Sequence, residues 1–144
     1  MTTRREARRL ALDILYQADV TGSDGRAVLA EWGSAGRDIP PYARELVEGV
    51  AARLTELDRT IGAHAEGWAV ERMASLDRTI LRIATYELSS PESAVPVGAA
   101  IDEAVRAAKE LSTEDSGRFV NGVLGTIAAG TVRSSGPSDD GVTA

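Results

Sequence analysis

Apolar residues recur at every third or fourth position along most of the chain, a spacing that places them on one face of an α-helix. The first such stretch runs from Thr3 to Val20, and its apolar positions are Ala7, Leu10, Ala11, Ile14, Leu15 and Ala18. No segment alternates between apolar and polar residues for long enough to predict a β-strand. The pattern therefore predicts an all-α protein of six or seven helices.

Glycine, proline and polar residues predict where the helices of the first half end. Residues 21–25 stop the first helix, a short helix is expected over residues 24–32, and a loop is expected over residues 33–41. One long helix is then predicted over residues 41–65, because its apolar residues keep to one side for the whole length.

Three further helices are predicted in the second half of the chain. The first opens at Ser75, a candidate N-cap, with Asp77 in its first turn, where a carboxylate interacts favourably with the helix dipole. Asp77 and Glu87 both fall within the apolar arc of this helix. Each is therefore expected either to reach water at a helix end or to belong to a contact surface. The second helix covers residues 96–111, and the third begins after residues 112–116.

The last helix and the C-terminal residues differ in composition. Gly122 and Gly125 lie inside the helix, and small residues are typical of places where two helix backbones approach closely, so another helix is expected to cross there. After Gly130 the chain consists mainly of serine, glycine, proline and aspartate, which bury too little apolar surface to order a segment. We therefore predict a helical domain over residues 1–131 and a disordered tail over residues 132–144.

Composition narrows the possible functions. With 144 residues the chain is long enough for one domain that folds alone. It contains no cysteine, which excludes disulfides and cysteine-based zinc sites. No apolar run approaches the roughly 20 residues needed to cross a bilayer, and the N-terminal residues lack the apolar segment of a signal peptide. The sequence therefore predicts a cytoplasmic protein that does not bind a membrane.

The N-terminal helix carries the strongest charge feature. Four arginines and one glutamate give residues 1–9 a charge of +3 in a chain of net charge −6, so the remainder carries −9. The arginines are Arg4, Arg5, Arg8 and Arg9. On a helical wheel, the side opposite the apolar face is formed by Arg5, Arg9, Leu12 and Tyr16. A solvated face would accept lysine equally well. The exclusive use of arginine, which binds phosphate in a bidentate manner, therefore favours nucleic acid as the ligand.

Candidate catalytic residues are few. His64 is the single histidine and no motif surrounds it, so a partly exposed helix histidine is expected there. Nucleophile elbows, zinc-binding helices, P-loops and dinucleotide-binding glycine motifs are all absent from the sequence. We therefore predict that the protein is not an enzyme and needs no metal or other cofactor.

Two segments of the chain resemble a known family. Residues 109–124 have the pattern K-x-x-x-x-E-D-S-x-x-F-V-N-G-V-L, and residues 76–88 read L-D-R-T-I-L-R-I-A-T-Y-E-L. Together with I-D-E-A-V at residues 101–105 and the Leu15-Tyr16 pair after the basic opening, they resemble the NusB family of transcription antitermination factors. The resemblance covers Arg4 to about Ile127, and no family motif matches residues 19–41.

The resemblance implies a fold of two three-helix lobes and a role in transcription. Proteins of the NusB family bind boxA-type single-stranded RNA with the ribosomal protein NusE, and the two hold the RNA on elongating RNA polymerase during ribosomal RNA transcription. The family's RNA surface maps here to Arg4, Arg5, Arg8, Arg9, Tyr16, Asp115 and Phe119. Its partner-binding residues map to Asp77 and Arg78. A homodimer is a possible further state.

Two other functions remain open from the residues alone. Helical bundles with arginine-led helices also include helix-turn-helix regulators that bind DNA, although no helix here shows the polar face expected of a recognition helix. A non-catalytic protein-interaction bundle, whose basic helix binds an acidic partner, is the third possibility. Comparing single-stranded RNA with duplex DNA at two salt concentrations would distinguish the three.

Overall fold

A computed structural model describes residues 3–90 and 93–135, and within these ranges it contains only helices. In chain order they are α1 (Arg4–Thr21), α2 (Gly25–Ser34), α3 (Pro41–Ala52), α4 (Leu54–His64), the 3-10 helix η1 (Val70–Arg72), α5 (Ser75–Ser89), α6 (Val97–Leu111) and α7 (Glu114–Ser135). The all-α prediction is confirmed.

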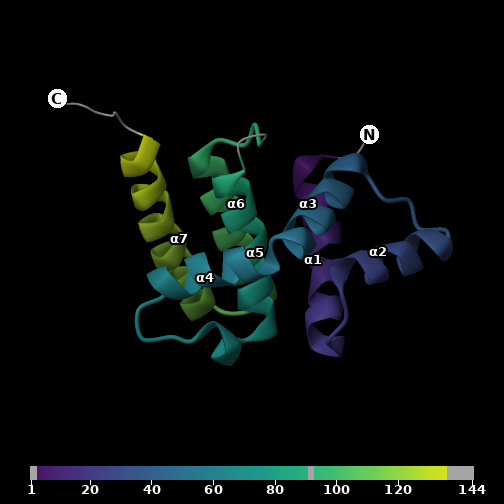
Figure 1. Cartoon of the computed structure of the whole chain (residues 1–144), viewed down its shortest axis with the longest axis horizontal. Helices are drawn as coiled ribbons and strands as arrows, with labels where there is room; N and C mark the ends of the chain where they lie inside the picture. Colours follow the sequence, from purple (N-terminus) through teal and green to yellow (C-terminus); the bar gives the residue numbers. More distant parts are fainter. Residues whose placement is uncertain (1–2, 91–92, 136–144) are drawn as a thin grey trace.

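The helices form two groups, which we call the first and second lobes (Figure 1). The first lobe consists of α1, α2 and α3, which pack on one another. The second consists of α4, α5, α6 and α7, and α5 lies at its centre against the other three. Because α1 and α3 also pack on α5, the two lobes share one apolar core. The fourth helix of the second lobe results from a break in the helix predicted over residues 41–65.

That predicted helix is two helices, α3 and α4, joined at Arg53. The backbone of Arg53 leaves the helical region, with φ −116° and ψ 23°, and the chain turns from the first lobe into the second. Leu46 in α3 and Leu57 in α4 are both fully buried, although their helices belong to different lobes. A break of one residue does not shift the spacing of the apolar residues. The sequence pattern therefore gave no sign of the break.

The positions of close helix approach also differ from the prediction. A Cβ added to Gly122 or Gly125 would meet no atom within 4 Å, so no helix crosses there and that prediction is wrong. The close approach is at Gly49 of α3, where an added Cβ would lie 2.3 Å from the ring of Tyr86 in α5. Gly49 therefore allows the two lobes to pack closely.

The start of α1 is fixed by a capping box. The Thr3 side chain accepts a hydrogen bond from the Glu6 amide at 3.1 Å, and the Glu6 carboxylate accepts one from the Thr3 amide at 2.9 Å. The helix ends at Gly22, whose φ of 71° is a left-handed conformation that glycine adopts without strain. The one acidic residue among the N-terminal arginines thus holds the first turn in place.

The C-terminal helix is longer than predicted. α7 continues to Ser135, past Gly130, where the sequence pattern ended. Residues 136–144 lie outside the described part of the chain, so the disorder predicted for them remains a prediction. Among residues 3–90 and 93–135, no helix is both long and apolar enough to span a bilayer.

Candidate nucleic-acid interface

Arg5 and Arg9 lie on the side of α1 that faces α6. The Arg5 guanidinium donates to both carboxylate oxygens of Glu103, with Nε to Oε1 at 3.0 Å and Nη2 to Oε2 at 2.8 Å. Arg9 forms an ion pair with Glu110, which lies further along α6. The Arg5 side chain remains 54% exposed, so its charge is accessible from solvent. The hydrogen bond from Arg5 also lowers the pKa of Glu103.

Arg8 has a different environment, because it lies between the two lobes. Its side chain is 14% exposed, and its Nε donates at 2.8 Å to Oε2 of Glu87, which is 1% exposed. The Tyr42 hydroxyl of α3 donates to the same oxygen. Burial, with the Glu87 contact, raises the pKa of Tyr42. Arg8 therefore joins α1, α3 and α5, and it compensates the charge of a carboxylate in the core.

The position of Glu87 in the structure differs from the sequence-based prediction. Its position in an apolar arc predicted either contact with water at a helix end or a place on a contact surface, but the carboxylate is buried and paired within the chain. The residues that pair with it, Arg8 and Tyr42, come from segments 79 and 45 positions away. Such a contact leaves no periodic signal in the sequence of α5.

Arg4 lies on the same side of α1 as Arg8. Its guanidinium carbon is 4.3 Å from the centroid of the Tyr42 ring, a cation–π distance. The four arginines thus lie in two pairs on two sides of α1. Arg4 and Arg8 contact residues of α3 and α5, whereas Arg5 and Arg9 face the carboxylates of α6.

The helical wheel placed Leu12 and Tyr16, with Arg5 and Arg9, opposite the apolar face of α1, and this prediction is only partly confirmed. Tyr16 is 41% exposed, as expected for that side. Leu12, placed there by the same wheel, is buried and lines a small cavity with residues of α5 and α6. The presence of α6 alongside α1 explains the difference, since a helical wheel contains no information about a second neighbouring helix.

Asp115 and Phe119, the candidate residues from the motif at residues 109–124, lie in the first turns of α7. Asp115 is highly exposed and forms an ion pair with Arg118, one turn later. Phe119 is half-buried and packs against the core, and its ring meets the edge of Trp68 at a centroid distance of 5.8 Å and an interplanar angle of 63°. Phe119 therefore combines a packing role with proximity to the surface.

Asp77 occupies the first turn of α5, beside α7. One carboxylate oxygen accepts a hydrogen bond from Ser116 Oγ at 3.2 Å. The other, Oδ1, is buried and has no hydrogen-bond partner among the described residues. Burial raises the pKa of Asp77, while the bond from Ser116 acts in the opposite direction. A buried acceptor without a partner is costly, so the free energy of this site would improve if a donor reached the oxygen.

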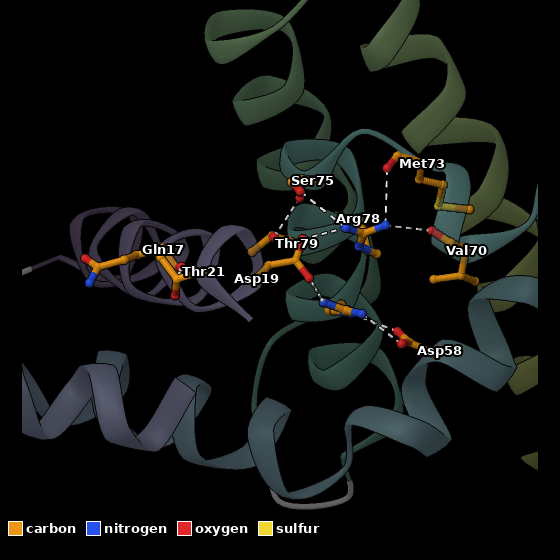
Figure 2. A network of polar contacts seen from close by, with 10 residues as sticks. Gln17, Asp19, Thr21, Asp58, Val70, Met73, Ser75, Arg78 and Thr79 are labelled. Carbon is orange, nitrogen blue, oxygen red and sulfur yellow. Dashed lines mark hydrogen bonds and ion pairs between the residues drawn. The ribbon is translucent and has the colours of Figure 1, made fainter. Parts of the chain in front are cut away.

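Arg78 lies in an internal polar network rather than on the surface (Figure 2). It donates to Asp19 at 2.6 Å, and to the backbone carbonyls of Val70 at 2.9 Å and Met73 at 3.2 Å. These bonds join the end of α1, η1 and the start of α5. With a side-chain exposure of 14%, Arg78 has little surface left for another molecule.

Arg82 extends the same network by one helical turn. It donates to Asp19 at 3.0 Å and, in a two-pronged contact, to both carboxylate oxygens of Asp58 in α4 at 2.8 Å. Burial alone would raise the pKa of Asp19, but the bonds from Arg78, Ser75 and Arg82 outweigh it and lower that pKa. Asp19, Asp58 and Arg82 were not among the residues that the sequence pattern singled out. The available signal was the Arg78–Arg82 spacing of one turn in an apolar helix.

His64, the single histidine, lies at the end of α4. His64 is partly buried, as predicted, and its Nδ1 lies 2.8 Å from the Thr60 carbonyl oxygen within α4. Among residues 3–90 and 93–135, no cluster of three histidine or carboxylate side chains is arranged to hold a metal ion.

Comparisons with known proteins agree on one family. Residues 5–129 match the NusB family. The transcription antitermination protein NusB of Saccharopolyspora erythraea is 48% identical over 132 residues, which cover 89% of this chain and 88% of that protein. The structure of T. maritima NusB superposes with a TM-score of 0.78 at 34% identity, covering 89% of this chain and 92% of that one.

A further solved structure contains other molecules. It is the crystal structure of antitermination factors NusB and NusE in complex with dsRNA, and one chain in it has a TM-score of 0.76 and 27% identity to this chain. The match covers 88% of this chain and 96% of that one. The family match spans nearly all of the described residues, and the relatives align over almost their full length. The chain therefore belongs to the NusB family.

Proposed function

We propose that this protein is a transcription antitermination factor that binds boxA-type RNA together with NusE. In this role it supports processive transcription of ribosomal RNA operons by RNA polymerase in the cytoplasm. The relatives at 41–48% identity carry the name transcription antitermination protein, and a structural neighbour was solved with NusE and dsRNA. The observation that carries the RNA assignment is the row of Arg5, Arg9 and Tyr16 along α1, which all remain partly exposed.

These three side chains suit RNA chemically. The guanidinium groups of Arg5 and Arg9 lie one turn apart and offer bidentate hydrogen bonds to phosphate oxygens. The exposed Tyr16 ring, two turns beyond Arg9, offers a surface on which a base can stack. Arg4 adds positive charge at the N-terminal end of α1. Arg8 contributes by holding α1 against α5 through Glu87 rather than by contacting phosphate.

The carboxylates of α6 compete with RNA for these arginines. Glu103 and Glu110 already occupy the donors of Arg5 and Arg9 in the free protein. A phosphate must therefore replace them or share the guanidinium edge. Asp115, exposed at the start of α7, adds a further negative charge near Phe119. RNA affinity is consequently set by a balance between the arginines and these nearby carboxylates.

NusE is proposed to bind at the first turn of α5. The buried Oδ1 of Asp77 has no partner among the described residues, and a Lys, Arg or backbone N–H of the partner would satisfy it. Arg78 supports this site indirectly, because its bonds to Asp19 and to the η1 region hold the start of α5 in place.

Charge removal on α1 tests the RNA assignment. We expect Arg5→Ala combined with Arg9→Ala to weaken single-stranded RNA binding and to lower the log–log salt slope by about 0.7 for each phosphate that the variant no longer neutralises. Arg26→Ala is the matched control, since Arg26 is 53% exposed and forms an ion pair on α2. Wild-type affinity and slope in the double variant would refute the proposal.

A further inference from the structure

Trp68 is a large aromatic residue displayed on the surface by an ordered turn. It lies between α4 and η1, and 54% of it is exposed. Gly67, with φ of 80°, precedes it, and the Trp68 amide donates to the Ala65 carbonyl oxygen at 2.9 Å. An indole that an ordered turn holds outward offers a face on which a planar group can stack.

The Trp68 ring adjoins Phe119, one of the residues assigned to RNA binding. It meets Phe119 in an edge-to-face contact at 5.8 Å, and Phe119 packs against the core behind it. Two bonds from neighbouring residues of α5 connect this end of the molecule to α1. Asp77 accepts from Ser116 of α7, and Arg78 donates to Asp19 of α1, one turn beyond Tyr16. Asp19, near the C-terminal end of α1, also lines the same cleft as Trp68, so Trp68 and Phe119 lie toward that end of α1.

The charges around Trp68 favour a base rather than a phosphate as the ligand. Trp68 lines an open cleft of about 700 Å³ whose charged residues are Arg59, Arg78, Arg82, Asp19, Asp58 and Glu71. The three arginines are balanced by the three carboxylates, and Arg78 and Arg82 are already paired with Asp19 and Asp58. A neutral cleft beside an exposed indole suits an uncharged planar group.

We propose that Trp68 is a stacking platform for an unpaired base of the bound RNA. It extends the RNA-binding surface from Phe119 on α7 across to the turn before η1. This inference rests on the proposed RNA-binding function. Stacking on an aromatic ring is independent of phosphate charge, so its contribution is separable from that of the arginines of α1.

Fluorescence provides the first test. The chain has two tryptophans, and Trp32 donates to Gln17, the neighbour of Tyr16, so its emission can also respond to RNA. In a Trp32→Phe variant the emission comes from Trp68. We expect boxA-type single-stranded RNA to quench it, with the same Kd as that obtained from the anisotropy of labelled RNA. Emission unchanged at RNA concentrations that saturate the anisotropy would overturn the inference.

Affinity at two salt concentrations provides the second test. Because stacking contributes about 1–3 kcal/mol per base, Trp68→Ala should weaken RNA binding about five- to 150-fold, with the salt slope unchanged. Trp68→Phe, which keeps a ring against Phe119, should retain most of the affinity and controls for loss of packing. Leu54→Ala, at an exposed apolar residue of α4, should have no effect.

The outcomes separate the two proposals. If wild-type protein binds RNA and Trp68→Ala binds it equally well, Trp68 is not a stacking platform and the RNA-binding function stands. If Trp68→Ala loses NusE binding but keeps RNA affinity, the ring belongs to the protein interface and the inference is wrong. If wild-type protein binds no RNA, the proposed function fails, and the inference fails with it.

Discussion

Arg8 and Arg5 lie three residues apart on α1, yet their environments predict different effects of removing them. Arg8→Ala would leave Glu87, 1% exposed, buried without its cation. Removing one partner of a buried ion pair costs about 3–5 kcal/mol, because the remaining charge is uncompensated. The Tyr42 hydroxyl would still donate to the Glu87 carboxylate, so we expect a loss near the lower end, about 3 kcal/mol. Arg5→Ala is the control, since exposed ion pairs contribute little to stability.

Urea unfolding followed by circular dichroism measures this difference. With a denaturant slope of about 1–3 kcal/mol per molar, a decrease of about 3 kcal/mol in the free energy of unfolding would move the Arg8→Ala midpoint down by about 1–3 M. We expect the Arg5→Ala midpoint to match that of the wild-type protein. Equal midpoints for the two variants would refute the reasoning, because the Arg8–Glu87 pair would then contribute no more than a surface pair.

A second substitution separates the effect of the buried charge from that of packing. In Arg8→Ala with Glu87→Gln, the core carries no uncompensated charge and the glutamine oxygen still accepts from Tyr42. We expect this double variant to be more stable than Arg8→Ala alone. The RNA salt slope of the folded Arg8→Ala protein should remain that of wild type. A decrease of about 0.7 would instead make Arg8 a phosphate contact.

Three other predictions concern carboxylates. Glu103→Gln frees Arg5 and should raise RNA affinity roughly two- to fivefold in an RNA titration, and an unchanged or lower affinity would contradict the competition described for α6. Asp77→Lys should abolish NusE capture in a pull-down while leaving RNA affinity unchanged, since like charges in an interface cost several kcal/mol; equal losses in both assays would show that the two surfaces are not separate. The pKa of Asp19 is lowered by folding, so its contribution to stability is complete above its unfolded pKa of about 3.9 and is lost as pH falls through the folded value. Asp19→Asn should therefore be less stable than wild type at pH 7, with a gap in urea midpoint that narrows below about pH 4, and a constant gap would contradict this linkage.

Local sequence patterns predicted most helices but not how the helices meet. The periodic stripe of α1 agrees with the structure, because it depends on residues within one or two turns. The prediction that Ser75 is the N-cap of α5 is wrong, since Ala74 occupies that position and no side chain caps the helix, although α5 does begin at Ser75. The break at Arg53 was missed because one non-helical residue does not disturb the apolar period. Glycine content alone also failed to locate helix crossings. Gly49 faces Tyr86 closely, while Gly122 faces open space, and only the neighbouring helix distinguishes the two.

The N-terminal arginines show why a charge pattern predicts a surface better than it predicts the role of each residue. Residues spaced by four recur on one side of a helix, so Arg4 and Arg8 face α3 and α5, while Arg5 and Arg9 face α6. The ion-pair partners of Arg5, Arg8 and Arg9 lie 98, 79 and 101 positions away, beyond the reach of any local pattern. A guanidinium that binds phosphate in a bidentate manner binds a buried carboxylate equally well. The exclusive use of arginine therefore does not distinguish the two sides of this helix. The partners do, because Arg8 is 14% exposed and paired with a buried carboxylate of α5, whereas Arg5 is 54% exposed and paired with a carboxylate of α6.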